Sequence, residues 1–510
     1  MMQINTLEYF ERGALLKCPE KVAVIDGDRA FTFKDLEINA KKLAKRIVQK
    51  NNIYNNPIAV FLPKNVHTII ANLGILYSGN FYFNLDIKSP TQRLSNIINH
   101  IKPATIVTSE QLKDSLIKIG VDKDCLIIAD ENINREIAYD NEMLMRRLDK
   151  IIDTDPVCLI NTSGSTGTPK GVVMHHRSVI DFIDWVNATF QFNETDIIGS
   201  LSPFYFDIYT LELYISLSRG TAIAIIPEQH AAFPIRLLEY LKEKNVSFIF
   251  WVPTIMVNIA NMDLLSKMPL DSLKIIFFAG EVFPMKQLNY WRRKIPKATF
   301  VNLYGPIEIA VDCTFFIMNR EFGDSDPLPI GFPCRNTNIL ILNDHNKPVE
   351  INEPGELCVR GSSLALGYWN DPEKTAKAFV QNPLNTYYPE LIYRTGDIVF
   401  VNELGEIMFL GRKDYQIKHL GYRIELSEIE HVIGSMADID NSCVLYHRQK
   451  KEITLFYEST KPINTADIRQ HVMQILPKYM VPTIFHQLDA MPRNPNGKID
   501  RQKLAEMYLG

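Results

Sequence analysis

Short apolar runs alternate with helix-like stretches through the first three hundred residues. An apolar run at 58–62 follows a segment in which Leu36, Ala40, Leu43 and Ile47 recur at helical spacing. Further runs have the length and hydrophobicity of buried strands, at 104–108, 126–129, 157–160, 171–174, 221–226, 248–251, 274–278 and 299–302. Helices are expected at 67–77 and from 208 to a stop near Gly220. This alternation predicts an α/β fold of layered sheets and helices.

The pattern changes twice in the second half of the chain. From about 326, Gly and Pro become frequent and short alternating strands appear at 337–342 and 355–360, which indicates a β-rich subdomain over about 327–411. A polar turn at 409–415 then precedes a stretch with its own strands, at 442–447 and 453–457, and helices, one opening at a capping box of Ser427 and Glu430. We therefore predict a large N-terminal domain over 1–411 and a small α+β C-terminal domain over 412–510.

Composition excludes several classes of protein. The 510 residues carry a net charge of −4, which gives no electrostatic reason to expect a nucleic acid or an acidic membrane as partner. Seven cysteines form no CxxC pair, which favours a reducing compartment over a disulfide framework or a zinc cluster. The N-terminus does not resemble a signal peptide, and the apolar runs are too short to cross a bilayer. We expect a soluble, cytoplasmic protein.

The loop Asn161–Gly171 is rich in Gly, Ser and Thr and ends with Lys170. Small residues let backbone N–H groups approach phosphate oxygens, hydroxyls add donors, and the lysine adds a positive charge. The loop is not a Walker A sequence, because Pro169 stands where the second glycine belongs and Gly171 follows the lysine. It joins strand to strand rather than strand to helix. We interpret it as a phosphate-binding loop; the alternative is a solvated linker.

Four later segments complete a pattern. They are Asn302-Leu-Tyr-Gly-Pro-Ile-Glu308, Tyr393-Arg-Thr-Gly-Asp397, Gly411-Arg-Lys-Asp-Tyr-Gln-Ile-Lys418 and Asn494-Pro-Asn-Gly-Lys498. Each alone is an ordinary turn. Together with the loop, and in this order, they resemble the adenylate-forming superfamily, which includes acyl-CoA synthetases, luciferases and amino-acid adenylation domains. The resemblance runs from about residue 20 to the end of the chain.

The resemblance implies a role for each segment. It implies that the loop binds the ATP phosphates through Thr162, Ser163, Gly164, Ser165, Thr166 and Gly167, with Lys170 and Lys498 as catalytic lysines. It implies that the nucleotide is bound by Gly280, Asn302, Tyr304, Asp397 and Arg412, that Glu308 holds Mg²⁺, and that Asp414 is a hinge for rotation of the small domain. The family usually has Thr where this chain has Ile307, which removes a hydroxyl expected near the α-phosphate.

Asp207 bears on the choice of substrate. Spacing alone makes it a helix N-cap, whereas by resemblance it matches the aspartate that pairs with a substrate's α-ammonium in amino-acid-activating members. The other expected substrate contacts form a mostly apolar wall, namely Ile208, Leu211, Phe250, Phe277, Ala279, Leu303, Val311 and the exception, Asp312. The wall implies a small or medium side chain, with a serine-like residue or D-alanine as candidates.

The sequence therefore predicts an AMP-forming amino acid:carrier protein ligase that depends on ATP and Mg²⁺. It resembles D-alanine:D-alanyl carrier protein ligases and the adenylation domains of nonribosomal peptide biosynthesis. The chain ends soon after Lys498, so we expect the phosphopantetheine thiol on a separate carrier protein; two Asp-Ser-Leu triads inside the ligase body are interpreted as coincidence. The alternatives are an acyl- or aryl-CoA ligase, and a degenerate nucleotide-binding protein without turnover.

Overall fold

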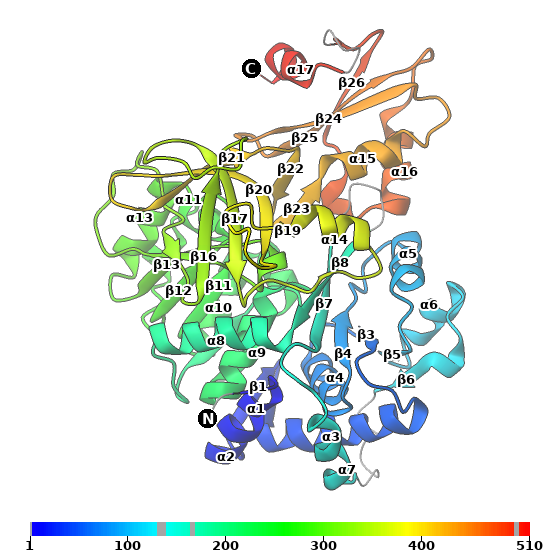
Figure 1. Ribbon diagram of the computed structural model, residues 1–510, viewed down its shortest axis with the longest axis vertical. Coiled ribbons are helices and arrows are strands. Elements are labelled where there is room, and N and C mark those ends of the chain that lie inside the picture. The colour runs from blue at the N-terminus through cyan, green and yellow to red at the C-terminus, as the bar shows by residue number, and fades with distance from the viewer. Residues whose placement is uncertain (1–2, 130–138, 164–168, 494–498, 510) are drawn as a thin grey trace. The chain divides into compact units, whose positions relative to one another are not determined.

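Two compact units make up the chain in the computed structural model, which describes residues 3–129, 139–163, 169–493 and 499–509 (Figure 1). The larger unit comprises Met1–Ile87, Lys102–Ile160 and Gly171–Lys413. The smaller unit comprises Lys88–Ile101, Asn161–Lys170 and Asp414–Gly510. Two short segments from the first third of the chain thus group with its C-terminal part. The boundary at 411/412 and the hinge at Asp414 stay predictions.

A nine-stranded sheet forms one layer of the larger unit. Its core strands pair in parallel, and the edge strands β2, β14 and β15 are antiparallel. In spatial order the strands are β15 (Phe332–Pro333), β14 (Thr314–Ile317), β13 (Thr299–Tyr304), β12 (Ile275–Phe278), β11 (Phe248–Trp251), β9 (Ile197–Ser200), β10 (Ala222–Ile225), β1 (Val22–Asp26) and β2 (Arg29–Thr32). The expectation of parallel strands between helices is confirmed.

A seven-stranded sheet forms a second layer. Its order is β18 (Gly367–Tyr368), β8 (Lys170–His175), β7 (Pro156–Thr162), β4 (Phe81–Asn84), β3 (Pro57–Phe61), β5 (Thr105–Thr108) and β6 (Leu126–Ile128). β7 and β8 are neighbours in this sheet, and the Gly/Ser/Thr loop connects them. The prediction that this loop joins strand to strand is therefore confirmed.

The hydrophobic core follows the alternation of side chains along the strands. One cluster contains residues of both sheets and of the helices α3 (Phe33–Lys50), α4 (Val66–Tyr77), α8 (His176–Thr189) and α9 (Ile208–Arg219). A second cluster lies on the other face of the nine-stranded sheet, with α10 (Pro234–Glu243), α11 (Pro253–Asn261) and α13 (Met285–Lys294). On β11, Phe248 and Phe250 belong to the first cluster, whereas Ile249 and Trp251 belong to the second. Both faces of this sheet are buried, so its strands are apolar throughout.

Helices of the larger unit begin and end at recognisable residues. Thr32 and Asp35 form a reciprocal capping box at the start of α3, Asn65 caps α4, and Gly220 ends α9 at φ +72°. The main helices are α3 (Phe33–Lys50), α4 (Val66–Tyr77), α6 (Lys113–Lys118), α8 (His176–Thr189), α9 (Ile208–Arg219), α10 (Pro234–Glu243), α11 (Pro253–Asn261), α12 (Leu264–Lys267) and α13 (Met285–Lys294). No helix in the described part of the chain has both the length and the apolar character needed to cross a bilayer.

Two helical segments were not expected. One runs from α1 (Leu7–Tyr9) to α2 (Leu15–Lys17), and its Phe10 and Ala14 are fully buried. The other, α7 (Asn141–Leu148), lies in a charged stretch for which no element was predicted; Asp140 caps it and Leu144 is fully buried. Both segments are short.

The predicted β-rich stretch forms a separate small sheet in the larger unit. Its strands are β16 (Thr337–Leu342), β17 (Gly355–Gly361), β20 (Leu391–Val401), β19 (Phe379–Gln381) and β21 (Ile407–Arg412), with α14 (Pro372–Ala378) between β18 and β19. All its pairings are antiparallel, as the alternating pattern predicted. β20 is long enough to pair with β17, β19 and β21, and it carries Asp397.

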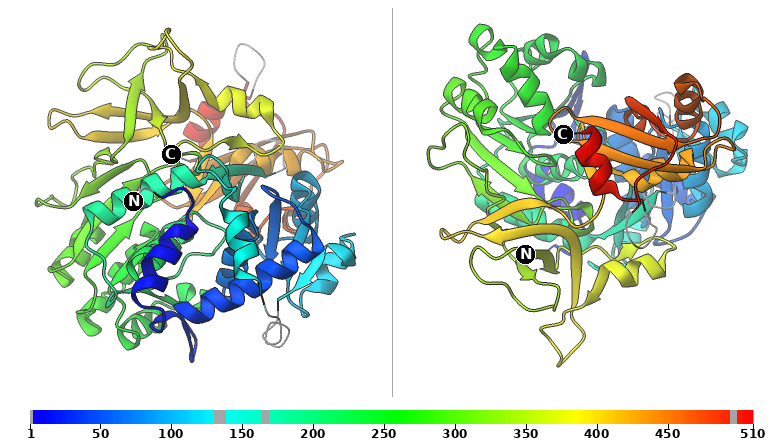
Figure 2. Two further views of the ribbon diagram at one scale, coloured as in Figure 1. Left: turned by 60° about the horizontal axis from the view of Figure 1, so that its bottom comes forward. Right: turned by 90° about the horizontal axis from the view of Figure 1, so that it is seen from above.

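The smaller unit is an α+β structure. It contains α5 (Thr91–Ile101), a hairpin of β22 (Gln416–His419) and β23 (Tyr422–Glu425), α15 (Leu426–Ile433), and a sheet of β24 (Asn441–His447), β25 (Glu452–Glu458) and β26 (Ile484–Leu488), with α16 (Thr465–Ile475) and α17 (Arg501–Tyr508). Leu504 of α17, red in Figure 2, packs with Leu445 and Phe456 of the sheet.

The capping box predicted at Ser427 is wrong. α15 starts at Leu426 and Glu425 is its N-cap residue, without a side-chain cap bond. Glu430 instead accepts hydrogen bonds from Arg501 at 2.6 Å and from the backbone N–H of Val444 at 2.6 Å. The Glu430 carboxylate, which the local pattern assigned to a helix cap, therefore forms a long-range ion pair with Arg501.

Candidate active site

Three predicted nucleotide contacts form one buried cluster. Asp397 on β20 lies opposite Arg412 on β21 in the antiparallel register, and the Arg412 guanidinium donates to Asp397 Oδ1 at 2.8 Å. Tyr304, the last residue of β13, donates its hydroxyl to Asp397 Oδ2. Asp397 is only 5% exposed, so its charge depends on these donors.

The cluster has the chemistry that a nucleoside requires. A carboxylate can accept hydrogen bonds from both ribose hydroxyls, and an aromatic ring offers a stacking surface for a base. Burial and the neighbouring Asp397 raise the pKa of Tyr304 well above its usual value, so the phenol stays a donor at neutral pH. The residues present therefore fit the ribose and base of ATP, although their individual roles stay predictions.

Two further predicted nucleotide contacts lie at the ends of neighbouring strands. Asn302 on β13 pairs in register with Phe278 on β12, and its amide donates to the carbonyl of Pro329 at 2.8 Å. Gly280 follows β12 and has φ +91°, a backbone conformation that favours glycine. Both residues lie at the carboxyl ends of parallel strands, where ligands bind in open α/β sheets.

A tight turn connects β13 to β14. A Cβ on Gly305 would lie 2.4 Å from Cα of Asp312, so no other residue fits there without a backbone shift. On the far side of the turn, Ala310 and Val311 have φ values of +52° and +74°. Such values are uncommon for alanine and are outliers for a β-branched residue. The turn therefore brings Glu308 and Asp312 to fixed places beside Tyr304.

Glu308, the predicted magnesium ligand, is fully buried in this turn. Its Oε1 accepts a hydrogen bond from the Tyr368 hydroxyl at 2.9 Å, and its backbone carbonyl accepts from the N–H of Ala365 at 2.8 Å. No group of three or more His, Cys, Asp or Glu side chains among the described residues is arranged to hold a metal ion. A single carboxylate suits Mg²⁺, which takes its other ligands from phosphates and water.

The predicted substrate contacts lie on one side of the nine-stranded sheet. Phe250 and Phe277 are opposite each other on β11 and β12 with ring centroids 5.9 Å apart, and both are buried. The apolar cluster that contains them also includes, as members or packed against it, Ile208, Leu211, Ala279, Leu303 and Val311. The structure thus brings together residues spread over a hundred positions. Ile307 belongs to this cluster too.

The two acidic residues of the predicted substrate site differ in burial. Asp207 is half-buried and is the N-cap residue of α9; its Oδ1 accepts from the N–H of Ile208 at 3.0 Å. Asp312 is 3% exposed. The cap that spacing predicted for Asp207 is present, and it engages one carboxylate oxygen in a short local bond.

The smaller unit contains the remaining predicted residues. The Ser163 hydroxyl donates to the carbonyl of Arg423 at 2.8 Å, and Lys170 Nζ lies 3.5 Å from Glu425. Asp414 is exposed and accepts from the N–H of Gln416 at 3.1 Å. Thr162 ends β7. Gly164, Ser165, Thr166, Gly167 and Lys498 lie outside the described residues.

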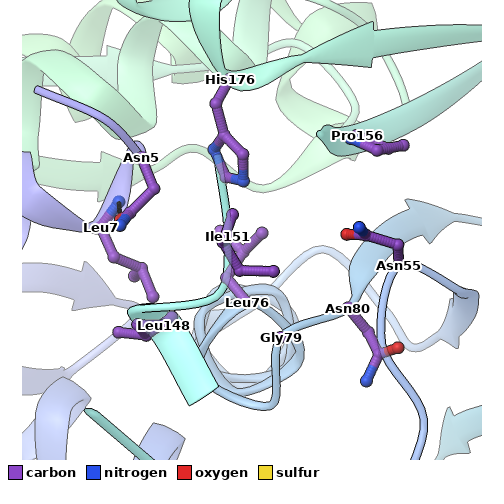
Figure 3. A pocket seen from close by; sticks show the side chains of 10 residues that line it. All are labelled: Asn5, Leu7, Asn55, Leu76, Gly79, Asn80, Leu148, Ile151, Pro156 and His176. Atoms are coloured by element: carbon purple, nitrogen blue, oxygen red, sulfur yellow. Dashed lines mark hydrogen bonds between the residues drawn. The ribbon is translucent and has the colours of Figure 1, made fainter. Parts of the chain in front are cut away.

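A small cavity elsewhere in the larger unit is unrelated to these residues. It has a volume of about 10 Å³, enough for about one water molecule. Figure 3 shows Asn5, Asn55, Asn80 and His176 among its lining residues. His176 Nδ1 accepts from the N–H of Thr6 at 3.1 Å, and burial lowers the pKa of His176 to about 3, so the ring is neutral. The cavity is too small for a nucleotide or an amino acid.

The sequence interpretation missed Tyr368. This residue lies on the edge strand β18, paired in register with Val172 of β8, and it reaches the buried Glu308 carboxylate. A signal was present in the short aromatic pair Tyr368-Trp369, which follows Gly367 and precedes the polar pair Asn370-Asp371. Pairing of β18 with the strand that follows the Gly/Ser/Thr loop could not be inferred from so short a strand.

Comparisons with known proteins identify the family of this chain. The family model described as AMP-binding enzyme matches residues 10–369, and the model described as AMP-binding enzyme C-terminal domain matches residues 428–498. Tyrocidine synthase 1 of Brevibacillus parabrevis is 31% identical over 96% of this chain and 44% of its own length. Gramicidin S synthase 2 of Brevibacillus brevis is 30% identical over 99% of this chain and 11% of its own length. The chain thus spans less than half the length of these relatives.

Solved structures share the fold. IdnL1 has a TM-score of 0.83 at 24% identity, covering 96% of this chain and all of that one. The Vibrio cholerae adenylation domain AlmE, in complex with glycyl-adenosine-5′-phosphate, has a TM-score of 0.83 at 20% identity, covering 99% of this chain and 98% of that one. The match of both family models, in the expected order and over most of the chain, shows that this protein belongs to the AMP-binding enzymes of the adenylate-forming superfamily.

Proposed function

We propose that the protein activates an amino acid with ATP as an aminoacyl-AMP, releasing pyrophosphate, and transfers the aminoacyl group to the phosphopantetheine thiol of a separate carrier protein. The observation that carries the proposal is the placement of Asp207. This half-buried residue is the N-cap of α9, and the first turn of that helix supplies Ile208 and Leu211 to the apolar cluster with Phe250 and Phe277. The Asp207 carboxylate would pair with the α-ammonium group of an amino acid, and the apolar wall beside it would contact the side chain of that amino acid.

The nucleotide end of the site would hold ATP in place for this step. Enzymes of this family use ATP. We assign the ribose to Asp397 and Arg412 and the base to the face of Tyr304, because these three groups already meet in one buried cluster. Glu308 would hold Mg²⁺, which offsets phosphate charge when bound. The Tyr368 hydroxyl fixes the direction of the Glu308 carboxylate before the ion arrives.

Attack of the substrate carboxylate on the α-phosphate of ATP requires that the two groups be positioned and that their negative charges be offset. A substrate carboxylate is a weak nucleophile and the α-phosphate repels it, so positive groups must offset both charges. We assign this role to Lys498, with Lys170 and the Gly/Ser/Thr loop binding the departing phosphates. Asp414 would be the hinge about which the C-terminal part moves between the two half-reactions.

The wall around Asp207 favours a small or medium side chain. Phe250 and Phe277 fill the space above β11 and β12, and Phe190 packs on Phe277 with ring centroids 4.7 Å apart. We infer that these packed rings limit the space for a long or aromatic substrate side chain. Asp312 adds a buried carboxylate whose chemistry suits a substrate hydroxyl or second amine. A serine-like residue and D-alanine both stay candidates.

A carrier protein is the acceptor most consistent with the relatives. The solved structure of PA1221, described as an NRPS protein containing adenylation and PCP domains, matches 99% of this chain with a TM-score of 0.83 at 20% identity. That likeness shows the fold alone. We propose a carrier thiol as acceptor because we propose an amino acid as the substrate. Nonribosomal peptide synthesis is the corresponding process.

A CoA ligase is the second candidate. The o-succinylbenzoate CoA synthetase of Bacillus subtilis matches 99% of this chain with a TM-score of 0.84 at 20% identity. The hydrogen bond from the Ile208 N–H to Asp207 favours this alternative, because it gives the carboxylate a purely structural use. In a CoA ligase the substrate would need no acid at this position.

Exchange of labelled pyrophosphate into ATP distinguishes these functions. The purified chain is assayed with each of the twenty standard amino acids, D-alanine, β-alanine, and a set of fatty and aryl acids. We expect exchange with one or a few small amino acids. The Asp397→Ala variant serves as the control for contaminating synthetases, because it should lose the exchange.

Each alternative has its own result in that assay. Exchange with fatty or aryl acids only would replace the amino-acid assignment by the CoA-ligase one. No exchange with any acid, from a folded protein that still binds ATP, would favour a nucleotide-binding protein without turnover. For an active amino acid, transfer of the label to a phosphopantetheinylated carrier rather than to coenzyme A tests the second half-reaction.

A further inference from the structure

The loop that leads to Asp207 is held by a lysine from the other sheet. Lys64 follows β3 of the seven-stranded sheet, immediately before the cap of α4. Its Nζ donates to the carbonyls of Ser200 at 2.7 Å, Leu201 at 2.8 Å and Ile226 at 3.2 Å. An ammonium group has three hydrogens, and each has an acceptor here. Two of these acceptors lie where β9 ends and the 201–206 loop begins.

An asparagine from the neighbouring strand holds the middle of the same loop. Asn84 is the last residue of β4 and is 9% exposed, and its amide donates to the carbonyl of Phe204 at 2.8 Å. The Phe204 ring stacks on Tyr209 of α9 at 4.2 Å between centroids, and Lys64 Nζ lies 5.6 Å from the Phe204 ring. The loop is thus held at its start and in its middle by residues of the other sheet.

A buried carboxyl group supports the lysine. Glu212 on α9 is fully buried, and its Oε2 accepts from the Ser200 hydroxyl at 2.5 Å. Burial lowers the pKa of Lys64 to about 8, while the charge of Glu212 acts in the opposite direction. Three carbonyl acceptors around Nζ hold the ammonium form. Glu212 therefore connects Lys64 to the helix that Asp207 begins.

We propose that Lys64 and Asn84 are positioning residues for the substrate's ammonium group, acting through the 201–206 loop to fix the place of Asp207. This inference rests on the proposed function, because it gives Asp207 a substrate partner. An anchor works only if its carboxylate is already in place, since ordering a loop on binding costs part of the affinity. The two residues supply that order from the ends of β3 and β4, with three hydrogen bonds to the backbone carbonyls of Ser200, Leu201 and Phe204.

A purely structural role predicts a different outcome. Loss of a general packing contact would lower stability and reduce the affinities for both substrates together. Loss of a positioning contact raises KM for the amino acid and leaves KM for ATP unchanged, because Tyr304, Asp397 and Arg412 lie on other strands. It also weakens the preference for an amino acid over the same acid without its amine.

The first measurement is hydrogen exchange in the full chain. Lys64→Met keeps the aliphatic stem and removes the three donors; Asn84→Leu removes one donor at similar volume and is the second variant if Lys64→Met fails to fold. We expect faster exchange across 201–210, where Phe206 N–H bonds to Pro203 and Thr210 N–H bonds to Asp207. Tyr240→Phe is the matched control, since it removes a donor to Ile225 at the end of β10 without contact to the loop. Unchanged exchange in both variants would overturn the proposal.

The second measurement is pyrophosphate exchange kinetics in the same variants. We expect KM for the amino acid to rise about tenfold and KM for ATP to stay within twofold, with Tyr240→Phe like the wild type. If the wild type is active and the variants change KM for the amino acid and KM for ATP equally, or change neither, the positioning role is overturned while the proposed function stands. A wild type inactive with every amino acid would overturn the proposed function and the positioning role with it.

Discussion

The nucleotide end and the amino-acid end of the candidate site are built in opposite ways. Tyr304, Asp397 and Arg412 come from three strands and meet through hydrogen bonds to one carboxylate. The predicted substrate wall around Phe250 and Phe277 is held by packing, in a cluster that continues into the core of the larger unit. One end is fixed by a few directional bonds and the other by many weak contacts.

This difference separates two kinds of change. ATP is the substrate shared by every acid that the enzyme activates. Removing a hydrogen bond to ATP should therefore lower the activity with all of these acids. A packed wall can change its shape in small steps, so altering it changes which acid is preferred. Substitutions at Asp397, Asp207, Phe277 and Ile307 test that separation.

Asp397→Ala is expected to have the largest effect. It removes the predicted acceptor for ribose and leaves the buried Tyr304 hydroxyl and the Arg412 guanidinium without this partner. Exchange activity should fall at least about a hundredfold, by the same factor for every amino acid accepted. Asp344→Ala is the control, because Asp344 is an exposed carboxylate paired with Lys413. A loss that differs between amino acids would break the separation.

Asp207→Asn is expected to have the next largest effect. The amide keeps an oxygen for the N–H of Ile208 but cannot neutralise an ammonium group. KM for the amino acid should rise roughly tenfold to a hundredfold while KM for ATP stays the same. Steady-state exchange kinetics with each substrate varied in turn measures both constants. If the two constants rise together, Asp207 is a structural cap and not an anchor.

Phe277→Ala should change preference rather than total activity. Removing the ring opens space against Phe250 and Phe190, so the ratio of kcat/KM for a larger to a smaller side chain should rise about tenfold. Unfolding should be easier by roughly 3–5 kcal/mol. Phe278→Ala is the matched control, since Phe278 is equally buried but belongs to the cluster on the other sheet face. A similar shift of preference in both variants would contradict the assigned wall.

Ile307→Thr is expected to have the smallest effect. It restores the hydroxyl that the family usually has, at a site where Ile307 is 7% exposed and packs in the apolar cluster. The exchange rate should rise a few-fold at most, equally for all acids, with a modest cost in stability of about 1 kcal/mol. Ile309→Thr, in the same turn and fully buried, should lose stability without that gain. A changed amino-acid preference in Ile307→Thr would show that Ile307 affects binding of the amino acid rather than of the nucleotide.

Prediction from the sequence succeeded where chemistry is local. The strand at 157–160, the loop and the strand at 171–174 were recognisable because small residues separate two apolar runs. Asp397 and Arg412 were identified one by one from separate motifs. Their direct bond follows from the register of β20 and β21, which no local pattern specifies.

It failed where a contact spans the chain. Glu430 had the spacing of a capping box, but a bond to Arg501, seventy-one positions away, outweighs that local use. Lys64 and Asn84 lie between ordinary strand and helix signals, and only the meeting of two sheets brings them to the 201–206 loop. α7 was missed because it has only eight residues in a charged stretch, and one of its three buried residues, Arg147, is itself charged.

The turn between Gly305 and Asp312 limits how the substrate end can evolve. Val311 is held at φ +74°, a conformation that costs a β-branched residue about 1–3 kcal/mol, and Gly305 leaves no space for a side chain. Glycine at position 311 would relieve that cost but would also free the backbone beside Asp312. New substrate preferences should therefore arise by substitution of side chains while the backbone of this turn stays unchanged. The protein would keep the energetic cost of the turn, because that backbone fixes the position of Asp312.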